Sequence, residues 1–192
     1  MSPAAERNKQ PILEGLRPWL PELGLVLEVA SGSGVHVGHL ARGLPRLRFQ
    51  PTDQSAEDFG LIEARVQGLS NVEAPLILDA SQDEWPVVRP DFLFNANMIH
   101  ISPVAVGHGL FEGAGRILAS GSRMATYGPY FEEEVETAAS NLAFDVSLKE
   151  RNSEWGIRRR EDVENWAGRC DLTLESRIEM PANNLLLIWR RT

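Results

Sequence analysis

Residues Leu25–Gly34 combine an apolar segment with a turn of small residues, a pattern that can hold a nucleoside cofactor. Leu25–Val29 is typical of a strand that is buried on both faces, as in a parallel sheet. Gly32 and Gly34 follow it and allow the backbone to adopt positive φ and to approach a ligand closely. A helix is predicted to begin at Val35, with its unpaired N–H groups directed into the turn. The pattern predicts an adenine-nucleoside site on an α/β sheet.

Two classes of cofactor use such a turn, and the spacing favours one of them. Dinucleotide-binding folds require G-x-G-x-x-G, but Val37 occupies the third glycine position here. Sites for S-adenosylmethionine (SAM) instead follow E/D-x-G-x-G-x-G, with an acidic residue inside the strand. This chain fits that register with alanine at the first glycine position: Glu28, Ala30, Gly32 and Gly34. Because a buried Glu28 costs free energy unless it is satisfied, the cofactor's ammonium or a water bound to it is a fitting partner.

Asp53 is the candidate for holding the sugar of such a cofactor. It follows the predicted strand Leu47–Gln50 and lies 19 positions after Gly34 (53 − 34). A carboxylate about 20 residues beyond the turn can accept hydrogen bonds from both ribose hydroxyls. The alternative is that Asp53 caps the next helix, but Ser55 can cap that helix itself. We therefore favour the ribose role.

Asp79 and Ala80 are candidates for the adenine end of the cofactor. They follow the third predicted strand, Ala74–Leu78. Asp79 can accept a hydrogen bond from the adenine amino group while the Ala80 backbone lies beside the ring. Asp79 is equally suited to forming the turn alone. Ser31 is a further candidate for binding the cofactor, because it lies in the turn of small residues that follows the first predicted strand.

The fourth predicted strand, Asp91–Met98, carries polar side chains at its carboxyl end. It is expected to lie beside the first strand, where chain direction around the sheet reverses and ligands bind. Asn95 is expected to contact the cofactor. Asn97 and His100 are expected at the reacting centre, with His100 as a base or orienting group. The alternative for a lone histidine is a structural role.

Two phenols follow the fifth predicted strand, Ser122–Thr126. Tyr127 and Tyr130 flank a rigid Gly-Pro turn. Tyr127 is a second candidate for accepting a proton, and Tyr130 is a candidate contact for a substrate. A helix with an acidic first turn is predicted over Glu132–Lys149.

Beyond that helix, Asn152 and Trp155 lie where this architecture often adds a substrate lid. Trp155 either packs on a substrate or only closes the core.

The other helices are predicted to begin at Pro11, near Ser55 and after Ser102 with Pro103. A short helix is expected over residues 162–169.

The last two predicted strands, Leu172–Glu179 and Leu185–Arg191, are joined by only five residues. Such a short joint requires an antiparallel hairpin, without a helix between the strands. A parallel sheet that ends in a hairpin is the ending of SAM-dependent methyltransferases and is unusual in dinucleotide folds.

The composition and the net charge limit the classes of protein to which the chain can belong. The chain has 192 residues, of which 43% are hydrophobic and 24% charged, as in a soluble single domain. A net charge of −8 argues against nucleic acid as a partner, so Arg158-Arg159-Arg160 and Arg190-Arg191 are interpreted as solvated surface. No segment suits a membrane span, the first residues lack a signal peptide, and Cys170 is the one cysteine. We therefore expect a cytoplasmic protein, and the sequence leaves its oligomeric state open.

Five blocks resemble a small family of methyltransferase-like proteins long catalogued as a domain of unknown function. These blocks are Ser2–Lys9, Leu27–Gly34, Thr126–Tyr130, Arg151–Gly156 and Met180–Asn184. The family is part of the class I SAM-dependent methyltransferases. The resemblance implies a Rossmann-like α/β domain over residues 1–192. Its sheet would have seven mostly parallel strands in the order 3-2-1-4-5-7-6, with strand 7 antiparallel and helices on both faces.

The resemblance also assigns roles to the ends of the chain. Residues 1–20 would form a helical flap over the cofactor, in which Arg7 or Lys9 meets a carboxylate. The alternative from the residues alone is a frayed terminus. Residues 128–160 would form a lid insertion. Asn183 is a further candidate for substrate binding, although a tight-turn role for it and Asn184 remains open.

Methyl transfer from SAM to a small organic acceptor is the predicted reaction. The cofactor supplies the leaving group, so the protein mainly positions the nucleophile and no metal is needed. The segment Asn95–Met98 lacks the Asn-Pro-Pro-aromatic signature of amide and adenine amino methyltransferases, which disfavours nucleic-acid bases and glutamine side chains. The alternatives are a SAM-binding protein that acts through a partner and, less favoured, a nicotinamide-dependent oxidoreductase.

Overall fold

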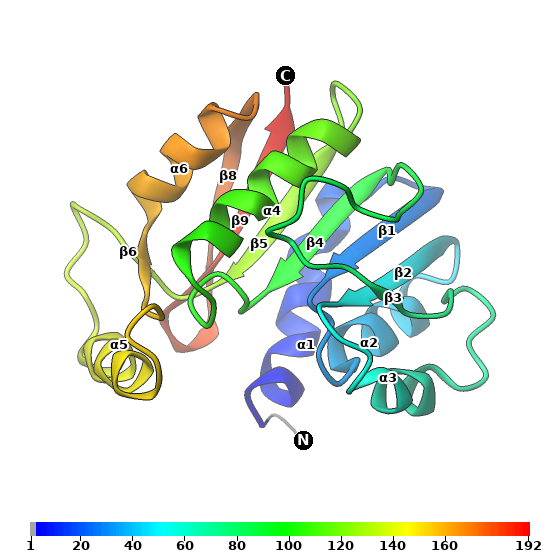
Figure 1. The fold of residues 1–192 in the computed structure, drawn as a ribbon, viewed down its shortest axis with the longest axis horizontal. Helices are drawn as coiled ribbons and strands as arrows, with labels where there is room; N and C mark the ends of the chain where they lie inside the picture. The colour runs from blue at the N-terminus through cyan, green and yellow to red at the C-terminus, as the bar shows by residue number, and fades with distance from the viewer. Residues whose placement is uncertain (1–2) are drawn as a thin grey trace.

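A seven-stranded sheet forms the middle layer of the computed structural model, which describes residues 3–192 (Figure 1). Its order is β3-β2-β1-β4-β5-β9-β8, and β1 to β5 are parallel while β9 runs antiparallel to both neighbours. The strands are β1 (Gly24–Val29), β2 (Leu47–Asp53), β3 (Leu76–Ile77), β4 (Phe92–Ala96), β5 (Arg123–Gly128), β8 (Leu172–Met180) and β9 (Asn184–Arg191). Counted within this sheet alone, the order is the predicted 3-2-1-4-5-7-6. The antiparallel hairpin is also confirmed.

A second, smaller sheet was not predicted. β6 (Tyr130–Phe131) and β7 (Arg158–Arg159) pair in parallel outside the main sheet. The pair joins the two ends of the segment that contains α5, so this segment is attached to the molecule at both ends.

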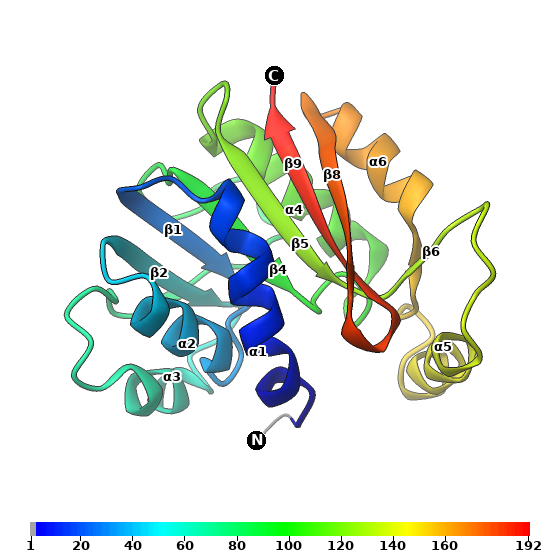
Figure 2. The same ribbon diagram turned by 180° about the vertical axis from the view of Figure 1, so that it is seen from behind.

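Helices cover both faces of the main sheet, as predicted. Figures 1 and 2 show α4 and α6 on one face and α1 and α2 on the other. α5 stands apart, beyond the carboxyl ends of the strands (Figure 2). The helices are α1 (Pro3–Leu16), α2 (Val35–Gly43), α3 (Phe59–Val66), α4 (Val104–Ile117), α5 (Ala139–Arg151) and α6 (Arg160–Gly168), with short 3-10 turns at Arg17–Trp19 and Pro181–Asn183.

The central strands are buried on both faces because each face packs on its own apolar cluster. Leu27 and Leu93 lie in the cluster beneath α4 and α6, whereas Val26 and Phe94 lie in the cluster beneath α1 and α2. This is the reason why β1 and β4 are almost entirely apolar. It also makes buried Glu28 the exception in β1.

Three predicted helix starts were wrong. α1 begins at Pro3, with Pro11 inside it, because Ala5, Asn8 and Ile12 form one buried face. α3 begins at Phe59 with Asp58 at its N-cap, so Ser55 does not cap it. α4 has Pro103 at its N-cap, so Ser102 does not cap it.

The start of α5 was also predicted too early. Glu132 lies outside the helix, and its carboxylate accepts from Arg177 Nη2 at 2.8 Å and from Arg160 Nε at 3.0 Å. These charge-assisted bonds fix Glu132 beside β8 and α6 instead of in a helical turn. The hairpin joint, where no helix was expected, contains the single 3-10 turn Pro181–Asn183.

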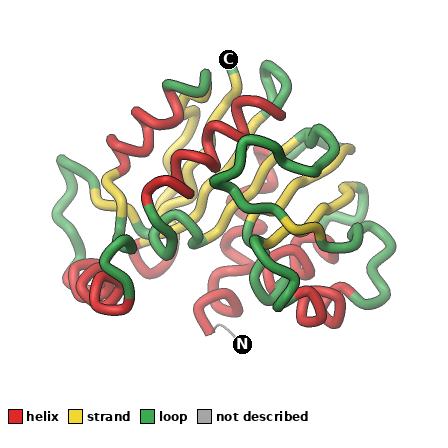
Figure 3. Tube along the Cα trace, viewed as in Figure 1, coloured by secondary structure: helices red, strands yellow, loops and turns green. Residues whose placement is uncertain are grey.

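Long loops lie at the carboxyl ends of the strands, after β3 and before α5 (Figure 3). Met1 and Ser2 lie outside the described residues; both belong to the predicted flap, and Ser2 is also the first residue of the first family block. Within residues 3–192 no helix is both long enough and apolar enough to cross a membrane.

Candidate functional site

A cavity of about 360 Å³ lies at the carboxyl ends of β1 to β4. Six of the predicted site residues line it: Ala30, Gly32, Asp53, Asp79, Ala80 and Trp155. Its other walls come from the turn after β4 and the start of α4, including Met98, Ile101, Ser102 and Val106. Because this is the edge where sequence analysis placed the cofactor, we refer to it as the strand-end cavity.

The turn after β1 has the backbone conformation that its small residues allow. Ala30, Gly32 and Gly34 have φ of 59°, 53° and 73°. A Cβ on Gly34 would lie 2.9 Å from Ile62 Cα, so close packing on α3 requires glycine there. A Cβ on Gly32 would meet nothing within 4 Å, and Gly32 lines the cavity. Gly34 is therefore needed for the close packing of the turn on α3, whereas the missing side chain at Gly32 leaves space open in the cavity.

Asp53 connects the first two strand ends. Its Oδ2 accepts from the Gly32 N–H at 2.8 Å, and its Oδ1 accepts from the Gln54 N–H at 2.8 Å. Each carboxylate oxygen keeps further acceptor capacity toward the cavity that Asp53 lines. The alternative role of Asp53 as a helix cap is not seen, since Asp58 is the N-cap of α3.

Glu28 lies beneath the turn with only 2% of its surface exposed. Its Oε2 is buried without a hydrogen-bond partner. Burial raises the pKa of Glu28 to about 8, although a hydrogen bond from the Ser31 side chain opposes the shift. Glu28 is therefore largely a neutral acid at pH 7. A cationic group bound nearby would favour its ionised form.

Asp79 forms the turn that was its alternative role. Its Oδ1 accepts from the Ser81 N–H at 2.9 Å and from the Ser81 hydroxyl at 2.7 Å. These bonds lower the pKa of Asp79, so it is ionised. Asp79 and Ala80 also line the cavity, so the turn role does not displace them from the site.

Two further buried polar atoms have no partner, one in Asn95 and one in Ser102. Asn95, like Glu28, is not among the residues that line the cavity. Asn95 is fully buried, and its Nδ2 donates to the Val29 carbonyl at 2.9 Å while its Oδ1 accepts nothing. The Ser102 hydroxyl, which the sequence suggested only as a helix cap, is buried and unpartnered and belongs to a residue that lines the cavity. Unsatisfied buried groups cost free energy, and a ligand that bonds them would offset this cost.

His100 and Asn97 are not among the residues that line the cavity. The His100 ring is 5.7 Å from the Phe144 ring of α5. Burial, followed by Arg158 and Arg151, lowers the pKa of His100 to about 3. Its imidazole is therefore neutral at pH 7 and only weakly basic. Asn97 has a φ of 65° and donates its N–H to the Tyr127 carbonyl at 2.8 Å.

Tyr127 belongs to a buried polar chain on the other face of the sheet. Its phenol is hydrogen-bonded to Asn8 of α1, and burial raises its pKa. The Oδ1 of Asn8 lies 2.8 Å from Nε2 of His36, whose pKa burial lowers to about 4. α1 is therefore fixed to the sheet through Asn8, whose burial the polar sequence of this segment did not reveal.

Neither cation of the predicted flap is among the residues that line the strand-end cavity. Arg7 is exposed. Lys9 pairs at 2.6 Å with Glu6, which also accepts from Arg65. The carboxylate that Lys9 meets is thus one of its own helix.

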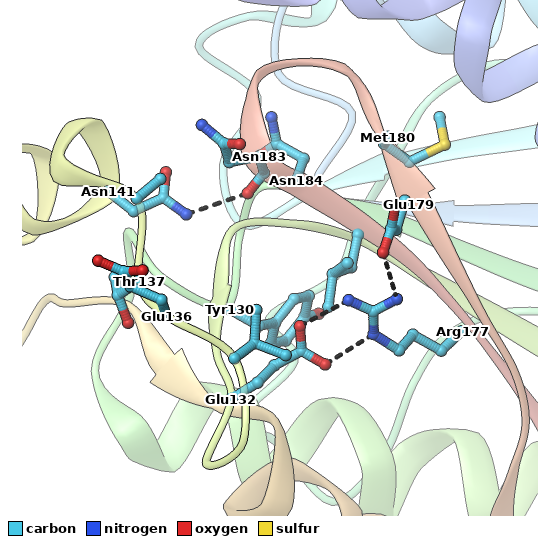
Figure 4. Close-up of a pocket in the computed structure, with 13 residues that line it drawn as sticks. Tyr130, Glu132, Glu136, Thr137, Asn141, Arg177, Glu179, Met180, Asn183 and Asn184 are labelled. Atoms are coloured by element: carbon cyan, nitrogen blue, oxygen red, sulfur yellow. Dashed lines mark hydrogen bonds and ion pairs between the residues drawn. The ribbon is translucent and has the colours of Figure 1, made fainter.

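Trp155 lines the strand-end cavity, whereas Tyr130 and Asn183 line a second one of about 230 Å³ (Figure 4). The Tyr130 hydroxyl donates to Thr126 Oγ1 at 2.9 Å. The Asn183 carbonyl accepts from Asn141 of α5 at 3.0 Å, and Asn183 has a φ of 55°, as in its alternative turn role. The Asn152 side chain accepts from the Glu154 N–H at 2.9 Å, which closes the turn that carries Trp155.

The strand-end cavity is acidic. Asp53, Asp58 and Asp79 line it, and its described lining contains no lysine, arginine or histidine. This charge suits a cation and opposes phosphate groups. Asp58, Ser102 and Met98 are lining residues that sequence analysis missed, because the folded turns rather than any local motif bring them to the cavity.

The fold is that of class I SAM-dependent methyltransferases. Human N-acetylserotonin methyltransferase (ASMT) in complex with SAM is similar with a TM-score of 0.81 at 12% identity, over 96% of this chain and 51% of that one. CalO1, a methyltransferase in calicheamicin biosynthesis in its SAH-bound form, gives 0.79 at 15% identity, over 98% and 54%. The pyocyanin biosynthetic protein PhzM gives 0.78 at 16% identity, over 94% and 54%. The chain spans about half the length of these structures.

The chain itself belongs to a family described as "Protein of unknown function (DUF938)", whose model matches residues 1–191. The suspected family is thereby confirmed.

Proposed function

We propose that this protein binds SAM in the strand-end cavity and transfers its methyl group to a small organic acceptor. The observation that carries the proposal is the acidic cavity beside the open Gly32 turn, at the switch point of a methyltransferase fold. SAM carries a sulfonium and an ammonium, which match the carboxylates. The SAH-bound form of CalO1 and the SAM-bound human enzyme support this choice of cofactor.

In this proposal each residue type has a defined task. Asp53 accepts from the ribose hydroxyls, and the Gly32 turn admits the adenosyl group. Asp79 and Ala80 contact the adenine, while Glu28, Asn95 and Arg7 remain candidates for the amino-acid end. SAM, when bound, supplies the methyl group as an electrophile. The protein positions the acceptor and excludes water.

Tyr127, His100 and Asn97 stay predictions for the acceptor side. The low pKa of His100 makes it a poor proton acceptor at pH 7, so an orienting role fits it better. The neutral phenol of Tyr127 can donate a hydrogen bond. Tyr130, Asn152 and Asn183 remain candidates for acceptor binding.

The acidic lining separates this proposal from nicotinamide-dependent redox chemistry. A dinucleotide brings a pyrophosphate, which three lining carboxylates repel. Calorimetric titration of the protein with SAM, SAH and NAD tests the distinction. Binding of SAM and SAH without NAD is expected, and binding of NAD alone would refute the proposal.

A pair of glycine variants tests the place of binding. Gly32→Leu fills open space in the cavity and should weaken SAH binding by more than about 100-fold, or 2.7 kcal/mol. Gly121→Leu is the control, since Gly121 also has positive φ and open space around it. Gly121 precedes β5 and therefore lies at the amino ends of the parallel strands, opposite the cavity. Equal affinities in the two variants would show that the site lies elsewhere.

A protein that binds SAM without transfer, and acts through a partner, is the second candidate. Turnover distinguishes it from an enzyme. Incubation with methyl-labelled SAM and a cell extract of small molecules should move label onto an extract component. No labelled product, despite tight SAM binding, would favour the second candidate.

A further inference from the structure

The three consecutive arginines Arg158, Arg159 and Arg160 were predicted to be solvated surface. In the structure each of them has different surroundings. Arg159 pairs with exposed Glu133, and Arg160 belongs to a network with Glu132, Glu161 and Glu164. Arg158 is half-buried, and among residues 3–192 it has no carboxylate within ion-pair distance. The prediction of a solvated surface is therefore wrong for Arg158, whose charge must be satisfied in another way.

Arg158 donates to three backbone carbonyls. Its Nη2 lies 2.7 Å from the Ser102 oxygen and 2.9 Å from the Glu154 oxygen, and its Nε lies 3.3 Å from the Ile99 oxygen. These carbonyls belong to two segments, the turn after β4 and the turn after α5. The planar fork of a guanidinium can bridge such groups, whereas an ammonium cannot do so in the same geometry. The Gly156 N–H adds a bond to the His100 carbonyl at 3.1 Å.

Both joined segments supply walls of the strand-end cavity. The turn after β4 contributes Ile101 and Ser102, and the turn after α5 contributes Trp155. Among the described lining residues, Trp155 is the one that follows Val106 in the chain. The Arg151 guanidinium lies 5.5 Å from the centre of the Trp155 ring and steadies the indole. Trp155 thus comes from the segment that follows α5 in the chain, whereas the other described lining residues come from Val29 to Val106.

We propose that Arg158 is a positioning residue that acts as a latch: it holds residues 152–156, and with them Trp155, against the strand-end cavity, where SAM would bind. The name of the ligand rests on the proposed function, whereas the latch is a property of the protein without ligand. With Arg158 in place the indole covers apolar ligand surface and keeps water from it. Without Arg158 three carbonyls lose a charge-assisted donor and the turn separates from β4.

Arg158→Met tests the latch, with Arg159→Met as the matched control. Methionine keeps a long apolar stem but donates no hydrogen bond. Hydrogen exchange in the ligand-free protein should become at least about tenfold faster over residues 152–158 in Arg158→Met, while exchange in β4 stays unchanged. Arg159→Met should match the wild type. Unchanged exchange over 152–158 in Arg158→Met would overturn the latch.

The link to Trp155 is tested by a double-mutant cycle on SAH affinity. Arg158→Met and Trp155→Ala should each weaken SAH binding about tenfold, and the double variant should be no weaker than Trp155→Ala alone. Arg158→Lys should restore only part of the affinity. Additive losses would overturn the action of Arg158 through Trp155. If the wild type does not bind SAH, the proposed function fails, and the exchange experiment alone decides on the latch.

Discussion

At the scale of single residues, three buried polar groups without partners lie at the strand ends, and one of them, in Ser102, belongs to a residue that lines the strand-end cavity. Glu28 Oε2, Asn95 Oδ1 and Ser102 Oγ are buried and unpartnered around the strand ends. Glu28 and Asn95 were predicted from their places in apolar strands. Ser102 was missed, because a Ser-Pro pair is also a common helix start and only the structure shows that its hydroxyl caps nothing.

Glu28 makes stability depend on pH in a defined direction. Its pKa is raised to about 8 in the folded protein from 4.5, so the folded state holds the proton more tightly. The stability that this proton contributes is complete below about pH 4.5 and is lost as pH rises through 8. Glu28→Gln should therefore flatten the fall in unfolding free energy between pH 5 and 9, by on the order of a few kcal/mol. Parallel profiles from chemical denaturation would contradict the assignment.

Glu28 should also couple cofactor binding to proton release. A bound cation near Oε2 favours the carboxylate, so SAM binding near pH 7 should release protons in the wild type and fewer in Glu28→Gln. Calorimetry in buffers with different ionisation enthalpies measures the difference. Identical proton release in both proteins would place the cation away from Glu28.

His100 is the residue whose role the reaction itself must decide. If it orients the acceptor, His100→Ala should slow methyl transfer about 10-fold or more while SAH affinity changes little. Comparing turnover with SAH binding in this variant separates the two roles. Equal losses in both would make His100 a structural residue beneath α5.

At the scale of elements, local patterns predicted most of the fold, and polar partners that are distant in the chain account for the starts of α1 and α5, which those patterns missed. β1, its turn and α2 follow from a continuous run of apolar and small residues. The start of α5 does not, because the arginines that hold Glu132 lie 28 and 45 positions away in the chain. α1 extends past its predicted start because Asn8 finds buried partners on two other elements.

The packing of α2 and α3 at the turn yields a stability prediction. Gly34→Ala places a Cβ 2.9 Å from the Ile62 backbone at a φ of +73°. Gly68 has a similar φ of +81° but open space around it. Gly34→Ala should therefore lower the free energy of unfolding by about 2 kcal/mol more than Gly68→Ala. Equal losses in thermal unfolding would show that the packing at Gly34 relaxes without cost.

At the scale of the whole molecule, the family resemblance predicted the order of the strands and the short joint predicted the final hairpin, whereas the second sheet was not predicted. β6 and β7 are two residues each and carry no periodic pattern, yet they tie both ends of the α5 segment together. In this arrangement Trp155 lies at the strand-end cavity and Tyr130 at the second cavity, which Asn183 of the β8–β9 joint also lines. The residues that sequence analysis proposed for substrate binding thus divide between two cavities.

A crystal structure of the protein with SAH tests the central claim most directly. We expect the adenosyl group in the strand-end cavity, with the Asp53 carboxylate within about 3 Å of the ribose hydroxyls and the adenine beside Ala80. SAH bound outside this cavity, or within it but with Asp53 turned away from the sugar, would contradict the account.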